Sequence, residues 1–185
     1  ENAFLSAGPA DGWTAERTSP GGENRRAPNA GMQGGACHLL SAPAGAPVEW
    51  WIATQNIGGL RPGDRAVASV SIRTEGVTGG SGAYFGMNYY DARGGRIAWT
   101  DSQTMLTGTH PWTRLSVPFA VPPGAVRVTL ALVLHGSGRA WFDRAQVEMG
   151  DAPTPWRPRE SPRATASRAR LGSVAIFRDS LPAVG

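Results

Sequence analysis

The sequence predicts an all-β protein built as a two-sheet antiparallel β-sandwich. Glycine and proline are abundant, at 25 and 15 of 185 residues, which is typical of many short strands separated by turns. Residues 126–135 alternate strictly, and the apolar face of this segment comprises Val126, Val128, Leu130, Leu132 and Leu134. A period of two with one apolar side indicates a half-buried strand. A second sheet must cover that buried face, which gives a sandwich.

Further strands are predicted wherever apolar or alternating segments are bounded by turn residues. The predicted strands are 36–41, 48–57, 65–74, 83–91, 96–100, 112–121, 126–135 and 139–148. Residues 19–35 are predicted to form a long loop, and 79–82 and 136–138 to be breaks between strands. The residues expected to face the core are Ala66, Ala68, Val70 and Ile72 (or the neighbouring register), and Ala83, Phe85, Met87 and Tyr89.

The domain organisation follows the change in composition near residue 151. Residues 1–151 are predicted to form the sandwich, and the Pro- and Arg-rich residues 152–171 a connector. Residues 172–185 contain a strand-like segment without an obvious partner in the chain. We expect it to dock on another subunit or to begin a further domain. Because the sequence has neither a starting Met nor a leader, we expect a processed form or a piece of a longer protein.

The charge distribution argues against nucleic acid as a partner. The formal net charge is +4, but residues 1–151 contain 12 Arg and 12 Asp plus Glu, so the surplus lies after them. A nucleic-acid reader usually concentrates basic charge on its folded surface. No stretch of 18 apolar residues is present, so no membrane insertion is expected.

Short motifs in a characteristic order support a family resemblance. They are GAYF at 82–85, DARG at 91–94, THPWTR at 109–114, VPPGA at 121–125 and AWFD at 140–143. With these motifs, residues 1–150 resemble carbohydrate-binding modules that have a galactose-binding-like jelly-roll fold. The segment AQVEMGDAPTPWRP at 145–158 looks like the end of such modules in bacteriophage tail and host-recognition proteins.

The resemblance implies a non-catalytic module that attaches a larger protein to a cell-surface or extracellular polysaccharide. The expected setting is a phage-tail-like host-recognition protein, located on a virion tail or otherwise outside the cell. Because similar modules occur on secreted glycoside hydrolases, substrate targeting for such an enzyme is an alternative. A purely structural spacer or decoration domain of a larger assembly is another.

A sugar-binding surface needs aromatic rings that stack on pyranose rings and polar side chains that bind the hydroxyls. The predicted sugar-binding residues are Tyr84, Asn88, Tyr90, Trp51, Arg127 and His135. The first three share the more polar face of strand 83–91. Arg127 and His135 join them if strand 126–135 lies in the same sheet. Trp50 or Trp51 can contribute, because only one of two adjacent strand residues faces the core, and we place Trp51 in the site.

The resemblance also implies a structural calcium ion held by Asp143 and by backbone carbonyls near Asn2. In the family the opening motif usually continues with Glu, where Leu5 stands here, so one expected ligand is missing. The alternative is that Asp143 accepts backbone N–H groups in a turn.

No catalytic activity is expected within this chain. A glycosidase needs two carboxyl groups across one site, whereas the acidic residues here are scattered one per segment. Ser137, His135 and Asp143 are the residue types of a hydrolase triad, but no nucleophile-elbow motif accompanies them. Cys37, the single cysteine, is predicted to be a buried thiol.

Overall fold

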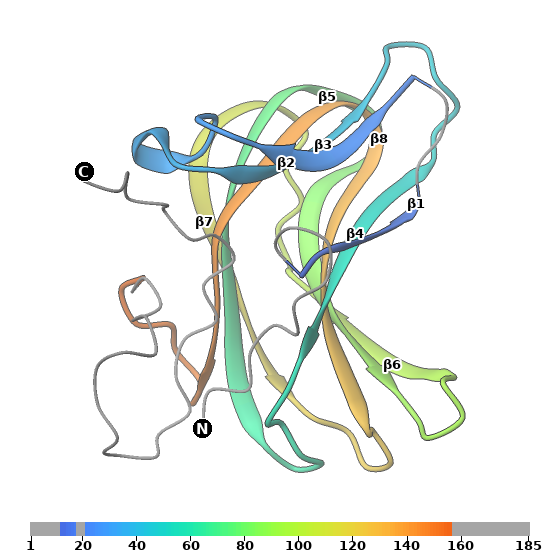
Figure 1. Cartoon of the computed structure of the whole chain (residues 1–185), viewed down its shortest axis with the longest axis vertical. Helices are drawn as coiled ribbons and strands as arrows, with labels where there is room; N and C mark the ends of the chain where they lie inside the picture. The colour runs from blue at the N-terminus through green and yellow to red at the C-terminus, as the bar shows by residue number, and fades with distance from the viewer. Residues whose placement is uncertain (1–11, 18–20, 157–185) are drawn as a thin grey trace, which may run out of the picture.

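The computed structural model describes residues 12–17 and 21–156, and this part of the chain is built from strands (Figure 1). The elements are β1 Thr14–Arg17, β2 Glu23–Ala27, the 3-10 turn η1 Met32–Gly34, β3 Cys37–Ala42, β4 Trp50–Ile57, β5 Arg65–Tyr90, β6 Arg96–Asp101, β7 Gly108–Ala120 and β8 Arg127–Met149. Among these residues, none lies in a helix that could cross a membrane.

Two long strands, β5 with 26 residues and β8 with 23, form both layers of the sandwich. They pair antiparallel from Ala66 opposite Met149 to Tyr90 opposite Arg127. Both bend over one end of the molecule, as Figure 1 shows. One layer has the order β1, β4, first part of β8, last part of β5, β6; the other has β2, β3, last part of β8, first part of β5, β7. The predicted antiparallel sandwich is therefore confirmed, and its two layers share β5 and β8.

The predicted breaks at 79–82 and 136–138 are wrong, because both segments lie inside these long strands. The strands pair there with register shifts, as expected where bulges bend a sheet. Gly136 has φ of +121°, and a Cβ on it would lie 2.4 Å from the Thr78 carbonyl oxygen. The glycines are therefore needed because the two backbones approach too closely at the bend for a side chain.

The core lies between the two layers and contains the alternating rows predicted from the sequence. Buried on its inner faces are Ala66, Ala68, Val70 and Ile72, then Ala83, Phe85, Met87 and Tyr89, then Val128, Leu130, Leu132 and Leu134. Val126 is an exception, since it precedes β8 and is 68% exposed. Cys37 is fully buried in a smaller cluster, as predicted, and burial raises the pKa of its thiol to about 12.

Residues 19–35 are not one long loop, which corrects the prediction. They include β2, which pairs with β3 from Glu23 opposite Ser41 to Ala27 opposite Cys37. The sequence of β2 is polar because the strand lies at the edge of its layer, where most of its side chains remain in contact with solvent. The predicted connector beyond 156 and the strand-like segment 172–185 lie outside the described residues.

Replacing Gly136 by alanine is expected to lower the free energy of unfolding by about 3 kcal/mol, because a methyl group adds a backbone clash to the cost of positive φ. Urea denaturation measures this loss. Gly45→Ala is the matched control: Gly45 has φ of +77°, but no atom lies within 4 Å of its Cβ position. The control should lose only about 1–2 kcal/mol. Equal losses in the two variants would contradict the close approach at the bend.

Candidate functional site

The candidate site is a groove of about 470 Å³ on the outer face of the layer formed by β4, β8, β5 and β6. Its lining residues are Trp50, Ile52, Tyr84, Asn88, Tyr90, Arg96, Trp99, Asp101, Ala131 and Val133. Alternate residues of a strand point to one face, so the lining residues of β4, β8 and β5 are two or four positions apart. On β6, Arg96 and Trp99 are three apart, next to a register shift against β5. The groove thus lies on the face opposite the Leu and Phe rows of the core.

Small residues hollow out the middle of this face. Tyr84 pairs with Val133, and Gly86 pairs both with Ala131 and with Asp101 of β6. A Cβ on Gly86 would lie 2.2 Å from Oδ1 of Asp101. The absence of a side chain at Gly86 therefore allows the carboxylate of Asp101 to lie over the strand.

At one end of the groove, Trp50 is held by two neighbouring rings. The ring of His135 stacks on it at a centroid distance of 3.9 Å and an angle of 5°, and Tyr84 meets it edge-on at 6.4 Å. Nδ1 of His135 accepts the backbone N–H of Ser81 at 3.0 Å. This bond from Ser81, in the bend of β5, fixes the imidazole ring of His135, which in turn supports Trp50.

At the other end, two arginines lie over aromatic rings. The guanidinium carbon of Arg127 is 3.7 Å from the ring centroid of Tyr90, and that of Arg96 is 5.2 Å from the ring centroid of Trp99. Arg96 also donates Nη1–H to Oδ1 of Asn88 at 3.3 Å. Trp99 is 62% exposed, so most of its surface remains available to a ligand.

Asp101 and Tyr84 give the middle of the groove its polar character. Burial raises the pKa of Asp101, while Arg96 acts in the opposite direction. Burial, and then the nearby Asp101, raise the pKa of Tyr84. Tyr84 therefore keeps its proton at neutral pH and presents a hydrogen-bond donor, whereas an ionised Asp101 presents acceptors.

Five of the six residues predicted to bind sugar lie in the groove or next to it, and the sixth, Trp51, does not. Tyr84, Asn88 and Tyr90 line the groove, although Tyr84 is only 4% exposed. His135 and Arg127 lie behind or beside it, where they pack on the rings of Trp50 and Tyr90.

Trp51 is a correction, because it is 2% exposed and packed in the core. The adjacent Trp50, 39% exposed, faces the groove instead. The reason is the register between strands: Trp50 pairs with His135, which lies on the outer face of β8.

The predicted site residues did not include Arg96 or Asp101 of β6, and Trp99 of the same strand was only a possible contributor because it lies near a strand end. These residues reach the groove because the turn after β5 folds β6 back, so that Trp99 lies opposite Asn88 and Asp101 opposite Gly86. Residues two apart on a strand share a face, so the sequence could have indicated that Trp99 and Asp101 lie on the same side of the sheet.

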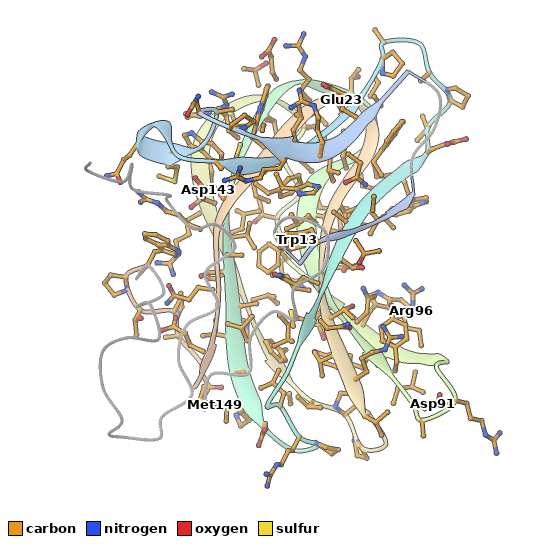
Figure 2. All side chains as sticks on the ribbon, in the orientation of Figure 1. Trp13, Glu23, Asp91, Arg96, Asp143 and Met149 are labelled. Atoms are coloured by element: carbon orange, nitrogen blue, oxygen red, sulfur yellow. The ribbon has the colours of Figure 1, made fainter. Side chains whose placement is uncertain are left out.

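Asp143 lies away from the groove, and Figure 2 shows it on the opposite side of the molecule from Arg96. Its Oδ2 accepts the N–H of Met32 at 2.7 Å and its Oδ1 accepts the N–H of Arg144 at 2.6 Å. Both bonds match the turn-stabilising role that was the alternative to metal binding. Residues 12–17 and 21–156 contain no group of three His, Cys, Asp or Glu side chains arranged for a metal. The backbone carbonyls near Asn2 lie outside the described residues, so the calcium site implied by the resemblance stays a prediction.

The three residues that would form a hydrolase triad have other partners. Ser137 donates its hydroxyl to the Thr78 carbonyl at 3.4 Å, and Nδ1 of His135 contacts the Ser81 hydroxyl at 2.6 Å. Asp143 binds the backbone of Met32 and Arg144, as described above. These side chains therefore serve the bend and a turn.

Asp101→Asn is expected to raise the melting temperature at pH 7. Because the folded-state pKa of Asp101 is raised, the folded protein retains a proton that the unfolded chain loses above pH of about 4. Wild-type stability therefore falls as pH rises through this window, whereas Asn does not ionise. The difference in melting temperature between variant and wild type should be positive at pH 7 and vanish toward pH 3. A variant less stable at pH 7 would mean that attraction to Arg96 outweighs burial.

Comparison with known proteins supports the fold at low sequence identity. No protein-family profile matches the chain. The tRNA nuclease WapA of Bacillus subtilis (strain 168) is 29% identical over 124 residues, which are 64% of this chain. Those residues are 5% of the length of WapA, so the chain spans a small part of this curated relative.

Two solved structures share the architecture described above. One contains the CBM22-1 and GH10 modules of Clostridium thermocellum xylanase 10B complexed with xylohexaose, with a TM-score of 0.59 and 20% identity over 75% of this chain and 26% of that one. The other is the enzymatically active domain of bacteriophage CBA120 tailspike protein 4, with a TM-score of 0.55 and 16% identity over 75% of this chain and 19% of that one. The predicted resemblance is confirmed at the level of the fold: the chain is a jelly-roll β-sandwich, similar in fold to a structure that contains a carbohydrate-binding module.

Proposed function

We propose that this domain binds a polysaccharide chain along the groove of the β4–β8–β5–β6 layer and acts as a non-catalytic attachment module. The observation that carries the proposal is the pair of exposed indoles, Trp50 and Trp99, on the rim of a groove with a polar middle. An exposed ring offers an apolar surface that matches the C–H face of a pyranose. Asn88, Asp101 and the hydroxyl of Tyr84 then provide donors and acceptors for the sugar hydroxyls.

Neighbouring side chains hold the aromatic rings of the groove in place, which favours a preformed site. His135 fixes Trp50 by stacking, and Arg96 and Arg127 pack against Trp99 and Tyr90. A ring that is already held in place loses little conformational entropy when it binds a ligand. The groove of the described residues contains one carboxylate, Asp101, whereas glycoside hydrolysis uses two. This composition favours binding over cleavage.

The likeness to a xylanase module complexed with xylohexaose supports a β-linked polysaccharide as the first ligand to test. We propose a location outside the cell or on a virion tail, within a host-recognition protein, with the tailspike likeness as support. The xylanase likeness supports a second setting, in which the domain directs a secreted glycoside hydrolase to its substrate. Docking of residues 172–185 on another subunit or domain is also a proposal.

Trp50→Ala and Trp99→Ala are each expected to weaken binding to soluble xylan by about tenfold or more, because each removes a stacking surface worth about 1.4 kcal/mol or more. Isothermal titration calorimetry measures the affinity, and thermal melting checks that each variant is folded. Ile97→Ala is the matched control, since Ile97 is 42% exposed but does not line the groove. The control should bind within about twofold of the wild type.

The unmodified protein must first be tested against a panel of neutral and acidic plant, bacterial and fungal polysaccharides. Binding to at least one of them, lost on changing Trp50 or Trp99, supports attachment. If the folded protein binds none, the domain is better explained as a structural spacer.

A further inference from the structure

The two arginines at the Tyr90 end of the groove have no counterpart at the Trp50 end. Tyr90 of β5 pairs with Arg127 of β8 on one side and with Arg96 of β6 on the other, so three adjacent strands bring these residues together. Both arginines are exposed. Within the described part of the chain, neither forms an ion pair with a carboxylate.

The acidic groups around this end leave it positive. Asp101 pairs with Gly86, which lies four residues along β5 from Tyr90. Arg96 is the arginine whose charge acts on Asp101, where it opposes the effect of burial on the pKa of the carboxyl group. Asp91 is the other nearby acid, and its Oδ1 accepts the N–H groups of Arg93 and Gly95 in the turn. Arg127 is therefore the least compensated charge of the groove.

A guanidinium stacked on a ring is well suited to bind a carboxylate. Contact with the ring of Tyr90 restricts the guanidinium of Arg127, and a guanidinium held in place can form two parallel bonds to a carboxylate. Arg96 is held similarly by Trp99 and Asn88. Neutral sugars need no such charges, since amide, hydroxyl and carboxylate side chains bind their hydroxyls.

We propose that the groove selects a polysaccharide that carries carboxylate groups, that is, a chain with uronic-acid units, and that Arg127 with Arg96 binds the carboxylate at the Tyr90 end. This inference rests on the proposed function of the same groove. A uronate is favoured over the phosphates of a nucleic acid because, among residues 12–17 and 21–156, two arginines gather beside Tyr90, and residues 1–151 have balanced charge. A nucleic acid engages an extended basic surface.

The test compares two forms of one polymer: glucuronoxylan and the same glucuronoxylan after chemical reduction of its carboxyl groups. The full chain should bind the acidic form about tenfold more tightly at low salt. This preference should shrink at about 0.5 M salt, where charges are screened over a few ångströms. Arg127→Gln should reduce the ratio of the two affinities to about two or less, and Arg127→Lys should restore only part of it, because lysine lacks the planar fork.

Arg139→Gln is the matched control, since it removes an equal charge from an exposed position on the last part of β8, where Arg139 pairs with Glu75 at 3.6 Å. It should preserve the full preference for the acidic polymer. Equal affinity of the wild type for both polymers would overturn the uronate inference and leave the proposed function intact. Binding to neither polymer nor to any other polysaccharide would instead count against the proposed function. Displacement of glucuronoxylan by a lower concentration of single-stranded RNA would overturn the choice of a uronate.

Discussion

The close pairing of the glycine-rich segments of β5 and β8 is the constraint on which the rest of the structure depends. A Cβ on Gly80 would lie 2.4 Å from the carbonyl oxygen of His135, and a Cβ on Gly136 would lie 2.4 Å from the carbonyl oxygen of Thr78. Without side chains here, both strands bend and pass from one layer to the other. The bend closes the core and also forms the groove face, because Ser81 within it binds His135, which in turn stacks on Trp50.

Alternation in the sequence was enough to predict most of the strands, and the core rows of β5 and β8, where one face of the strand is more apolar than the other. It failed at 79–82 and 136–138, because glycine serves equally as a turn residue and as a residue at a close backbone approach. Whether a glycine lies in a turn or at a close backbone approach depends on the position of the partner strand, which local sequence does not give. The edge strand β2 was missed for a related reason: it is polar, and its strand structure comes from pairing with β3.

The site was predictable to the extent that it depends on one strand. Tyr84, Asn88 and Tyr90 share a face by alternation alone, and the structure brings all three to the groove. The choice between Trp50 and Trp51 depends on the register of β4 against β8, which local sequence does not determine. The residues of β6 depend on the register after the 91–95 turn, where an irregularity lies between Tyr89 and Tyr90.

The most direct test of the account is to follow the indole N–H signals of the seven tryptophans by NMR while a xylan or glucuronoxylan oligosaccharide is added. If the sugar lies along the groove, the signals of Trp50 and Trp99 will shift with the ligand, while those of the core residues Trp13 and Trp51 will change little. Shifts confined to Trp112 and Trp141, which pack on Arg73 on the other layer, would contradict it.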